Sequence, residues 1–338
     1  MKTYWFRTQA CFLLLLSLAV LPACNRGRGR VLEISYVSAP QVALRDRVAP
    51  VYEKVGIVKN GDRVEVLDRE RRFLRVRTAS GAEGWLEQRY VISQQTYDQL
   101  QKLAQDNRDT PVQAAGTTRN DTNIHLEPAR DAEHLYQLAQ GSKVSILKRE
   151  TSEKPTTAST PVKSKDKNEP PKAAMEDWWL VRDSQGRTGW VLARMVDIDV
   201  PLEIAQYAEG QRIQAFFELD QVQDGDKKVQ EYLVLLSESK DGMPFDYNQV
   251  RVFTWNVRKH RYETAYRERN LDGVFPVTVT HENFDKEGTL PVFMLKVRDE
   301  QGNLLDRKYK LNTPIVRRVL AAGEVPQRQV AKKRSRQH

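Results

Sequence analysis

Apolar and polar positions alternate in short runs along much of this 338-residue chain. Between residues 36 and 92 the runs are separated by turn residues such as Gly61 and Asp62. Short alternating runs at this spacing are typical of a small antiparallel barrel. The pattern therefore predicts a first β domain over residues 36–92.

The same pattern returns further along the chain. Gly61 corresponds to Gly141 at an offset of 80 residues, whereas Trp85 corresponds to Trp190 at an offset of 105 residues. The difference between the two offsets indicates an insertion of about 25 residues inside a second copy. We therefore expect a repeated β domain over residues 111–198.

The extra residues have an unusual composition. The stretch 151–176 is rich in Lys, Pro, Ser, Thr and Glu, and it has almost no apolar side chains. Such a segment cannot offset the entropy that is lost on ordering. It is predicted to be a disordered insertion between two strands of the second domain.

Residues 93–110, between the two copies, depart from the strand pattern. Ser93 is suited to cap a helix, and the apolar side chains that follow it have helical spacing: Tyr97, Leu100, Leu103 and Ala104. A short amphipathic connector helix is expected there.

Residues 200–316 are again strand-like, with seven candidate strands separated by turn signals such as Asp224-Gly225 and Asp272-Gly273. The candidates are residues 213–219, 232–236, 250–257, 261–267, 274–279, 292–297 and 304–311. A β-hairpin across Arg258-Lys259-His260 is predicted. The whole chain is thus expected to be all-β, with a C-terminal antiparallel sandwich or barrel after the two small domains.

Three motifs of the first copy resemble the bacterial SH3-type domain, a barrel of five to six strands that is marked by a Gly-Trp pair. They are Asp62-Arg63-Val64-Glu65-Val66-Leu67, Phe73-Leu74-Arg75-Val76-Arg77 and Gly84-Trp85-Leu86. The second copy keeps Trp179-Leu180-Val181-Arg182 and Gly189-Trp190-Val191, but it lacks the usual arginine after Leu126. The resemblance implies two tandem SH3-like barrels over residues 36–198.

Domains of that family often accompany wall hydrolases and guide them to peptidoglycan. The resemblance therefore implies a cell-wall polymer or an envelope protein as the partner. Because no hydrolase domain is recognised beside the two copies, a noncatalytic scaffold or tether is favoured over an enzyme.

The N-terminus begins with Lys2 and Arg7, followed by an apolar run over residues 11–21 that is too short to span a bilayer. Together with Leu21-Pro22-Ala23-Cys24 it resembles a bacterial lipoprotein signal. The resemblance implies cleavage after Ala23 and lipidation of Cys24. The alternative is an ordinary secretory signal that leaves Cys24 free.

Lipidation would place the mature protein in the cell envelope, on a membrane and facing the periplasm or the outside. Residues 24–35 would form a flexible tether whose arginines can contact anionic head groups. Asn25 is not an acidic retention signal, which favours the outer membrane over the inner one. Cys11 leaves with residues 1–23, so the mature chain can form no internal disulfide.

The net charge of +9 is concentrated in the two flanks. The first 30 residues carry five basic and no acidic side chains, and residues 317–338 carry seven basic and one acidic, so the body between them is slightly acidic. Residues 317–338 are predicted to be a disordered basic tail. Binding of nucleic acid or an anionic polymer by this tail is an alternative, but export argues against nucleic acid as a partner.

No sequence motif points to catalysis. None of the five histidines lies two to four residues from another, and no zinc, phosphate-loop or nucleophile-elbow motif is present. We therefore expect no catalytic residues, no metal and no cofactor. The rival hypothesis is an envelope hydrolase with its site in the C-terminal β domain, around His281 and Glu282.

Aromatic residues are the candidate ligand-binding groups. Alternation places Trp179 on one face of its strand and Trp178 on the other. If Trp178 and its counterpart Phe73 face solvent, they form an apolar patch suited to peptides or sugar rings. Packing against the neighbouring domain is the alternative. Trp85 and Trp190 are predicted to lie in the barrel cores.

Overall fold

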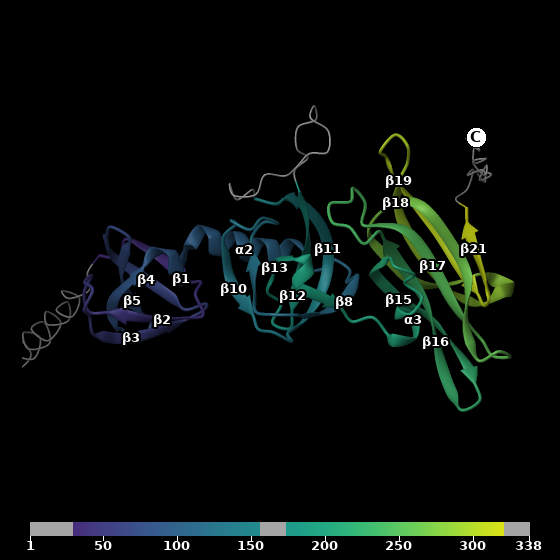
Figure 1. The fold of residues 1–338 in the computed structure, drawn as a ribbon, viewed down its shortest axis with the longest axis horizontal. Coiled ribbons are helices and arrows are strands. Elements are labelled where there is room, and N and C mark those ends of the chain that lie inside the picture. The colour runs from purple at the N-terminus through teal and green to yellow at the C-terminus, as the bar shows by residue number, and fades with distance from the viewer. Residues whose placement is uncertain (1–29, 156–173, 321–338) are drawn as a thin grey trace, which may run out of the picture. The chain divides into compact units, whose positions relative to one another are not determined.

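The computed structural model describes residues 30–155 and 174–320, which form three antiparallel sheets of seven strands each (Figure 1). The all-β class predicted from the sequence is confirmed. The chain divides into two compact units, one ending at Gln94 and the other starting at Gln95. The first unit holds the first sheet, and the second unit holds the other two.

The first sheet has the strand order β3-β2-β6-β5-β4-β1-β7. Its strands are β1 (Glu33–Val37), β2 (Gln41–Arg45), β3 (Lys54–Lys59), β4 (Arg63–Glu70), β5 (Phe73–Thr78), β6 (Glu83–Glu87) and β7 (Val91–Ser93), with a 3-10 turn at Gln88–Tyr90. Side chains that alternate along these strands form its core, among them Val37, Leu44, Val66, Val76 and Leu86. Residues 33–35, expected in the tether, belong to β1.

The second sheet has the order β10-β9-β13-β12-β11-β8-β14, which repeats the order of the first sheet strand for strand. Its strands are β8 (Ala114–Thr118), β9 (Thr122–His125), β10 (His134–Leu138), β11 (Lys143–Glu153), β12 (Met175–Asp183), β13 (Thr188–Leu192) and β14 (Val196–Ile198). The repeat inferred from glycine and tryptophan spacing is therefore a repeat of topology.

The predicted insertion 151–176 is shorter than expected. Strand β11 continues to Glu153 and β12 begins at Met175, and the two pair up to that last residue. The polar composition of these strand ends did not predict a β structure. They form strands because backbone hydrogen bonds between β11 and β12 extend to Glu153 and Met175. Residues 156–173 lie outside the described residues.

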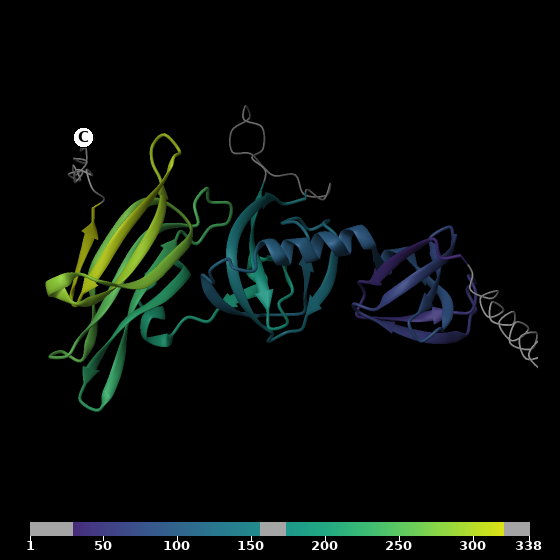
Figure 2. The ribbon, with the colours of Figure 1, turned by 180° about the vertical axis from the view of Figure 1, so that it is seen from behind.

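The predicted connector helix is present as α2 (Gln94–Asp106), with Leu100 buried. In the second unit, Leu103 packs against a cluster that contains Trp178 of the second sheet. The backbone carbonyl of Asn107, just past the helix, accepts a hydrogen bond from Arg182 at 2.5 Å. Figure 2 shows α2 running along the second sheet.

The third sheet is a meander in which neighbouring strands are consecutive in the chain. Its strands are β15 (Arg212–Asp224), β16 (Lys227–Ser237), β17 (Tyr247–Asn256), β18 (Arg261–Asn283), β19 (Thr289–Arg298), β20 (Leu304–Asn312) and β21 (Ile315–Val319), preceded by the short helix α3 (Leu202–Ala205). The hairpin across residues 258–260 is confirmed, since β17 and β18 pair there.

Two expectations for this region were wrong in detail. Asp272-Gly273 is not a turn, because β18 passes straight through it. Gly273 lies under the ring of Tyr247, which occupies the space that a side chain would need. The last strand, β21, includes residues expected in the basic tail, because Arg317 pairs with Lys310 of β20.

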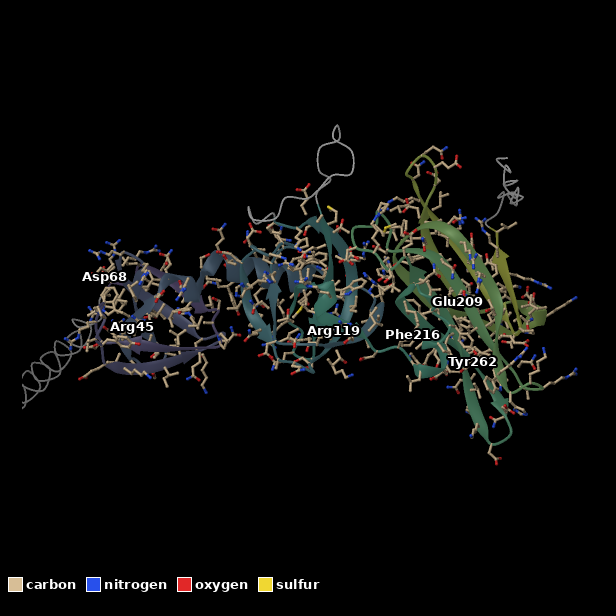
Figure 3. All side chains as sticks on the ribbon, viewed as in Figure 1. Arg45, Asp68, Arg119, Glu209, Phe216 and Tyr262 are labelled. Atoms are coloured by element: carbon tan, nitrogen blue, oxygen red, sulfur yellow. The ribbon has the colours of Figure 1, made fainter. Side chains whose placement is uncertain are left out.

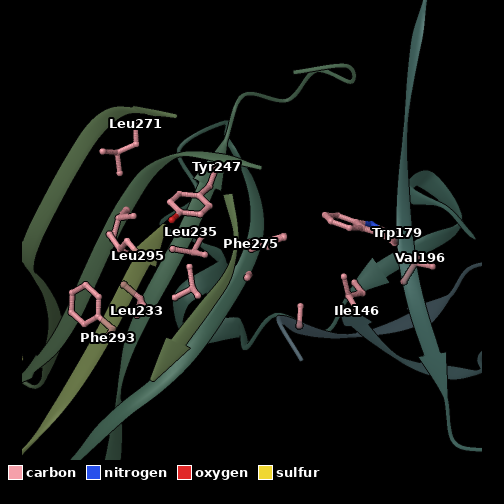
Figure 4. Packing of buried hydrophobic residues seen from close by; sticks show 14 of the residues in the cluster. Ile146, Trp179, Val196, Leu233, Leu235, Tyr247, Leu271, Phe275, Phe293 and Leu295 are labelled. Carbon is pink, nitrogen blue, oxygen red and sulfur yellow. The ribbon is translucent and has the colours of Figure 1, made fainter. Parts of the chain in front are cut away.

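The second and third sheets share one hydrophobic cluster (Figure 4). Trp179 from the second sheet lies 6.5 Å from Phe275 of the third, between ring centroids. The side chain of Gln113 accepts a hydrogen bond from the backbone N–H of Val277 at 2.7 Å. These contacts make the two sheets a single compact unit.

Several sequence predictions concern residues outside the described ranges. They are the signal segment 1–23, lipidation at Cys24, and the tail beyond residue 320. Within residues 30–155 and 174–320, no helix has the length and apolar character needed to cross a membrane.

Candidate binding faces on the first and second sheets

Phe73 and Trp178 do not form the solvent-facing patch that the sequence analysis considered. Their side chains are 6% and 1% exposed, respectively. Alternation on β12 is as predicted, but both faces of that strand are covered. Trp179 enters the core shared with the third sheet, while Trp178 is enclosed with Leu147, Trp190 and Leu103.

The two Gly-Trp tryptophans differ from each other. Trp190 is buried, but it lies with Trp178 in a cluster separate from the core cluster that contains Val191. Trp85 is only partly buried, so its placement in the barrel core was wrong. The reason is strand alternation, because Leu86 occupies the core position of β6 and turns Trp85 to the opposite face.

Phe73 and Trp178 nevertheless mark equivalent places in the two sheets. The last residue of β2, Arg45, pairs with Trp85, and the last residue of β9, His125, pairs with Trp190. We call the group Arg45, Tyr52, Phe73 and Trp85 the first ring face. We call the group His125, His134, Trp178 and Trp190 the second ring face.

The loop after each of these strands is closed by the same backbone hydrogen bond. Asp46 N–H donates to Glu53 at 3.0 Å, and Leu126 N–H donates to Glu133 at 2.9 Å. In the first sheet the Asp46 carboxylate also accepts from Glu53 N–H at 2.8 Å, and this bond lowers the pKa of Asp46. The loop thereby places Tyr52 beside Arg45.

The first ring face is built around the guanidinium of Arg45, a residue of the first sheet that is labelled in Figure 3. It lies 4.3 Å from the ring centroid of Tyr52 and 5.2 Å from that of Phe73. Arg72 also lies over Phe73, at 5.5 Å. Glu87 is 3.7 Å from Arg45, a weak ion pair at a partly exposed site. The face therefore combines a fixed cation with aromatic rings, which is suited to an anionic group.

The second ring face holds two imidazoles in place of the cation. The rings of His125 and His134 lie 5.3 Å apart, and His125 meets Trp178 edge to face at 5.5 Å. His125 Nδ1 lies 3.1 Å from the carbonyl oxygen of Ala132. Burial, as the main cause, lowers the pKa of both histidines, so both are neutral at neutral pH.

A small cavity of about 260 Å³ adjoins the second ring face. Its lining combines polar side chains with a short apolar wall: Asp121, Thr122, Asn123, His125, Arg130, Gln137, Trp178, Leu192 and Met195. Arg130 forms a two-pronged ion pair with the buried Glu176, and this pair lowers the pKa of that carboxyl group. The guanidinium is thus engaged before any ligand arrives.

The site proposed by the rival hydrolase hypothesis has a different character. His281 is exposed on β18, and the neighbouring Glu282 pairs with Lys308 at 2.6 Å. In the part of the chain that the structure covers, no group of three or more His, Cys, Asp or Glu side chains is arranged to hold a metal ion.

The sequence analysis missed Arg45, Tyr52, His125 and His134. The signal for two of them was present, since the offset of 80 residues that relates Gly61 to Gly141 also relates Arg45 to His125. A comparison of the residues at all strand ends at this offset would have identified Arg45 and His125 as equivalent positions.

One family model matches part of the chain. Residues 42–92 match the family SH3_3, described as Bacterial SH3 domain. This segment contains the whole first ring face. No curated protein matches the chain.

Three solved structures have weak similarity to the chain. One is an NlpC/P60 family protein from Bacillus cereus, with 9% identity and a TM-score of 0.22 over 49% of this chain and 56% of that one. The others are NlpC2 and NlpC1 from Trichomonas vaginalis. NlpC2 is 10% identical with a TM-score of 0.17, over 85% of this chain and 95% of its own. NlpC1 is 8% identical with a TM-score of 0.19, over 72% and 91%.

The chain thus spans just over half the length of the Bacillus cereus protein. At TM-scores this low, none of the three similarities defines a shared fold.

Proposed function

We propose that this protein is a noncatalytic binding protein of the cell envelope, whose ring faces bind cell-wall polymer or a protein partner. The observation that carries the proposal is the position of the first ring face inside the segment matched to the bacterial SH3 domain. The bacterial SH3 family implies a role in binding the cell wall. The first ring face supplies a cation and aromatic rings that can contact a ligand.

The chemistry of the first ring face supports this role. Arg45 is held between Tyr52 and Phe73, so little side-chain freedom is lost when a ligand binds. Trp85 adds a partly exposed indole beside it. Rigid aromatic and arginine side chains are the residues that contribute most to binding energy at interfaces.

The repeated strand order supports a second binding domain of the same type in the second sheet. Two binding faces on one chain raise the effective concentration of the second contact once the first has formed. A polymer that repeats its units, such as the cell wall, can use both faces. We further propose that lipidation at Cys24 holds the protein at an envelope membrane, with outer-membrane placement preferred.

Binding can be tested by cosedimentation of the full-length protein with purified wall sacculi. The double variant Arg45→Ala/Trp85→Ala is expected to weaken binding at least about tenfold, which matches the loss of one interface hot spot. Lys102→Ala, an exposed helix residue paired with Asp106, is the matched control. The proposal is wrong if neither sacculi nor an envelope lysate retains the wild-type protein.

Anchoring has a separate test. Palmitate labelling in cells is expected to tag the wild-type protein and not Cys24→Ser. Labelling that persists in Cys24→Ser would contradict lipidation at this residue, without bearing on wall binding.

A further inference from the structure

The two ring faces differ in charge at equivalent positions. In the first sheet, Arg45 at the end of β2 pairs with Lys54 on β3. In the second sheet the same pair of positions is held by His125 and His134. Two permanent cations are thus replaced by two imidazoles.

The pair of positions two residues before the end of β2 and of β9 also differs. In the first sheet it consists of Ala43 and Ile57, and Ile57 is 58% exposed. In the second sheet it consists of Asn123 and Gln137. An apolar strip is thus replaced by two amides, each of which can both donate and accept hydrogen bonds.

The arginine that lines the cavity of the second face is already paired. Arg130 is paired with Glu176, and the Asp121 carboxylate accepts a hydrogen bond from the backbone N–H of Gln140 at 2.8 Å. Both histidines are neutral at neutral pH because burial lowers their pKa. An anionic ligand would find no free cation on this wall.

The remaining groups of the cavity are uncharged. Among the described residues, the side chains of Thr122, Asn123 and Gln137 form no hydrogen bond with other parts of the chain. Leu192 and Met195 provide an apolar wall next to them. A volume of about 260 Å³ lies below the range for drug-sized ligands, so one ring with its substituents is the appropriate size.

We infer that the cavity beside the second ring face binds one sugar ring that carries no anionic group, in contrast to the first ring face, which takes an anionic group. The inference rests on the proposed wall-binding function and names the ligand class of its second site. The amides of Asn123 and Gln137 match sugar hydroxyls, which donate and accept as they do. Leu192 and Met195 cover the apolar face of the ring.

The probe is the trimer of N-acetylglucosamine, an uncharged acetamido sugar, titrated into the full-length protein by calorimetry. Gln137→Glu keeps the shape of the side chain but removes its two donors, and Asn123→Ala removes the opposite amide. Each is expected to weaken binding about five- to tenfold, which corresponds to one lost hydrogen bond. The double variant Asn123→Ala/Gln137→Ile, which copies the first sheet, is expected to abolish binding.

The matched control is Ala43→Asn/Ile57→Gln, the reverse exchange in the first sheet, which is expected to leave the affinity for the trimer unchanged. Thermal unfolding of each variant verifies that the fold is retained. Because Asn123 and Gln137 are only half-buried, we expect small changes in stability.

The outcomes separate this inference from the proposed function. If sacculi are bound but the trimer is not, or if the double variant binds the trimer like the wild type, the sugar site is wrong while wall binding stands. If sacculi are not bound but the trimer is bound through Asn123 and Gln137, the site stands and the wall-binding proposal fails.

Discussion

Arg149 and Asp177 form a buried ion pair at 2.8 Å, with their side chains 3% and 2% exposed. Arg149 also donates to the backbone carbonyl of Phe245 at 2.8 Å, in the segment that precedes β17. Asp177 accepts from the backbone N–H of Gly242 at 2.8 Å. A pair within the second sheet therefore holds a segment that belongs to the third.

Removing one partner of this pair should destabilise the unit that contains both sheets. Asp177→Ala leaves Arg149 buried without its closest anion, and we expect a loss of about 3–5 kcal/mol in the free energy of unfolding. Urea denaturation followed by circular dichroism measures this loss.

Asp106→Ala serves as the control for that measurement. It removes an exposed ion pair with Lys102 on α2 and should cost less than about 0.5 kcal/mol. Equal effects of the two substitutions would show that the buried pair does not join the sheets.

The glycine of each Gly-Trp pair should not tolerate a methyl group. A Cβ on Gly84 would lie 2.8 Å from side-chain atoms of Leu44 and Val55, and one on Gly189 would lie 2.7 Å from the carbonyl oxygen of His125. Gly84→Ala and Gly189→Ala are each expected to destabilise their unit by about 1–3 kcal/mol.

Gly56→Ala is the comparison for Gly84, since its new methyl group would come no closer than 3.4 Å to Leu44. A much smaller change in melting temperature is expected for this variant. If Gly84→Ala has the same melting temperature as Gly56→Ala, then the close approach of Leu44 and Val55 does not explain why residue 84 is a glycine.

The elements of this fold could be predicted from the sequence where a local pattern determines them. Strand alternation around Val64 and Val181, helical spacing around Leu100, and the paired spacing of Gly61 and Gly141 all depend on near neighbours. These features gave the all-β class, the connector helix and the repeat.

What could not be predicted depends on contacts between distant segments. Trp178 is enclosed because Leu103 of α2 reaches it, which no pattern on β12 reveals. The sequence around Gly273 predicts a turn, but the residue is a glycine because the ring of Tyr247 occupies the space of a side chain. The cavity beside His125 also needed the structure, since its walls come from β9, β10, β12 and the residues around Met195.

Trp178 and Trp85 should separate stability from binding. Trp178→Ala removes an enclosed indole and is expected to cost about 3–5 kcal/mol in the free energy of unfolding. Trp85→Ala removes a partly exposed indole, so it should weaken sacculus binding while changing stability less. Urea unfolding and cosedimentation, measured on both variants, test this. A Trp85→Ala variant as unstable as Trp178→Ala would place Trp85 in the core after all.

The two histidines of the second ring face should make stability depend on pH. Their pKa in the folded protein is lowered from 6.5, chiefly by burial, so the unfolded chain takes up protons first as the pH falls. Stability should therefore decline as the pH drops through about 6.5 and level off below the folded pKa. Urea unfolding from about pH 7.5 to about pH 5 measures this decline, with His125→Gln/His134→Gln as the comparison.

Glu231 and Asp246 act in the opposite direction, because burial raises their pKa and their protonation favours the folded state as the pH falls. Both acids are unchanged in the histidine double variant. The difference in pH slope between that variant and the wild type therefore isolates the imidazoles. Identical slopes would mean that the two histidines are not desolvated in the folded protein, and that the second ring face is not neutral for the reason given.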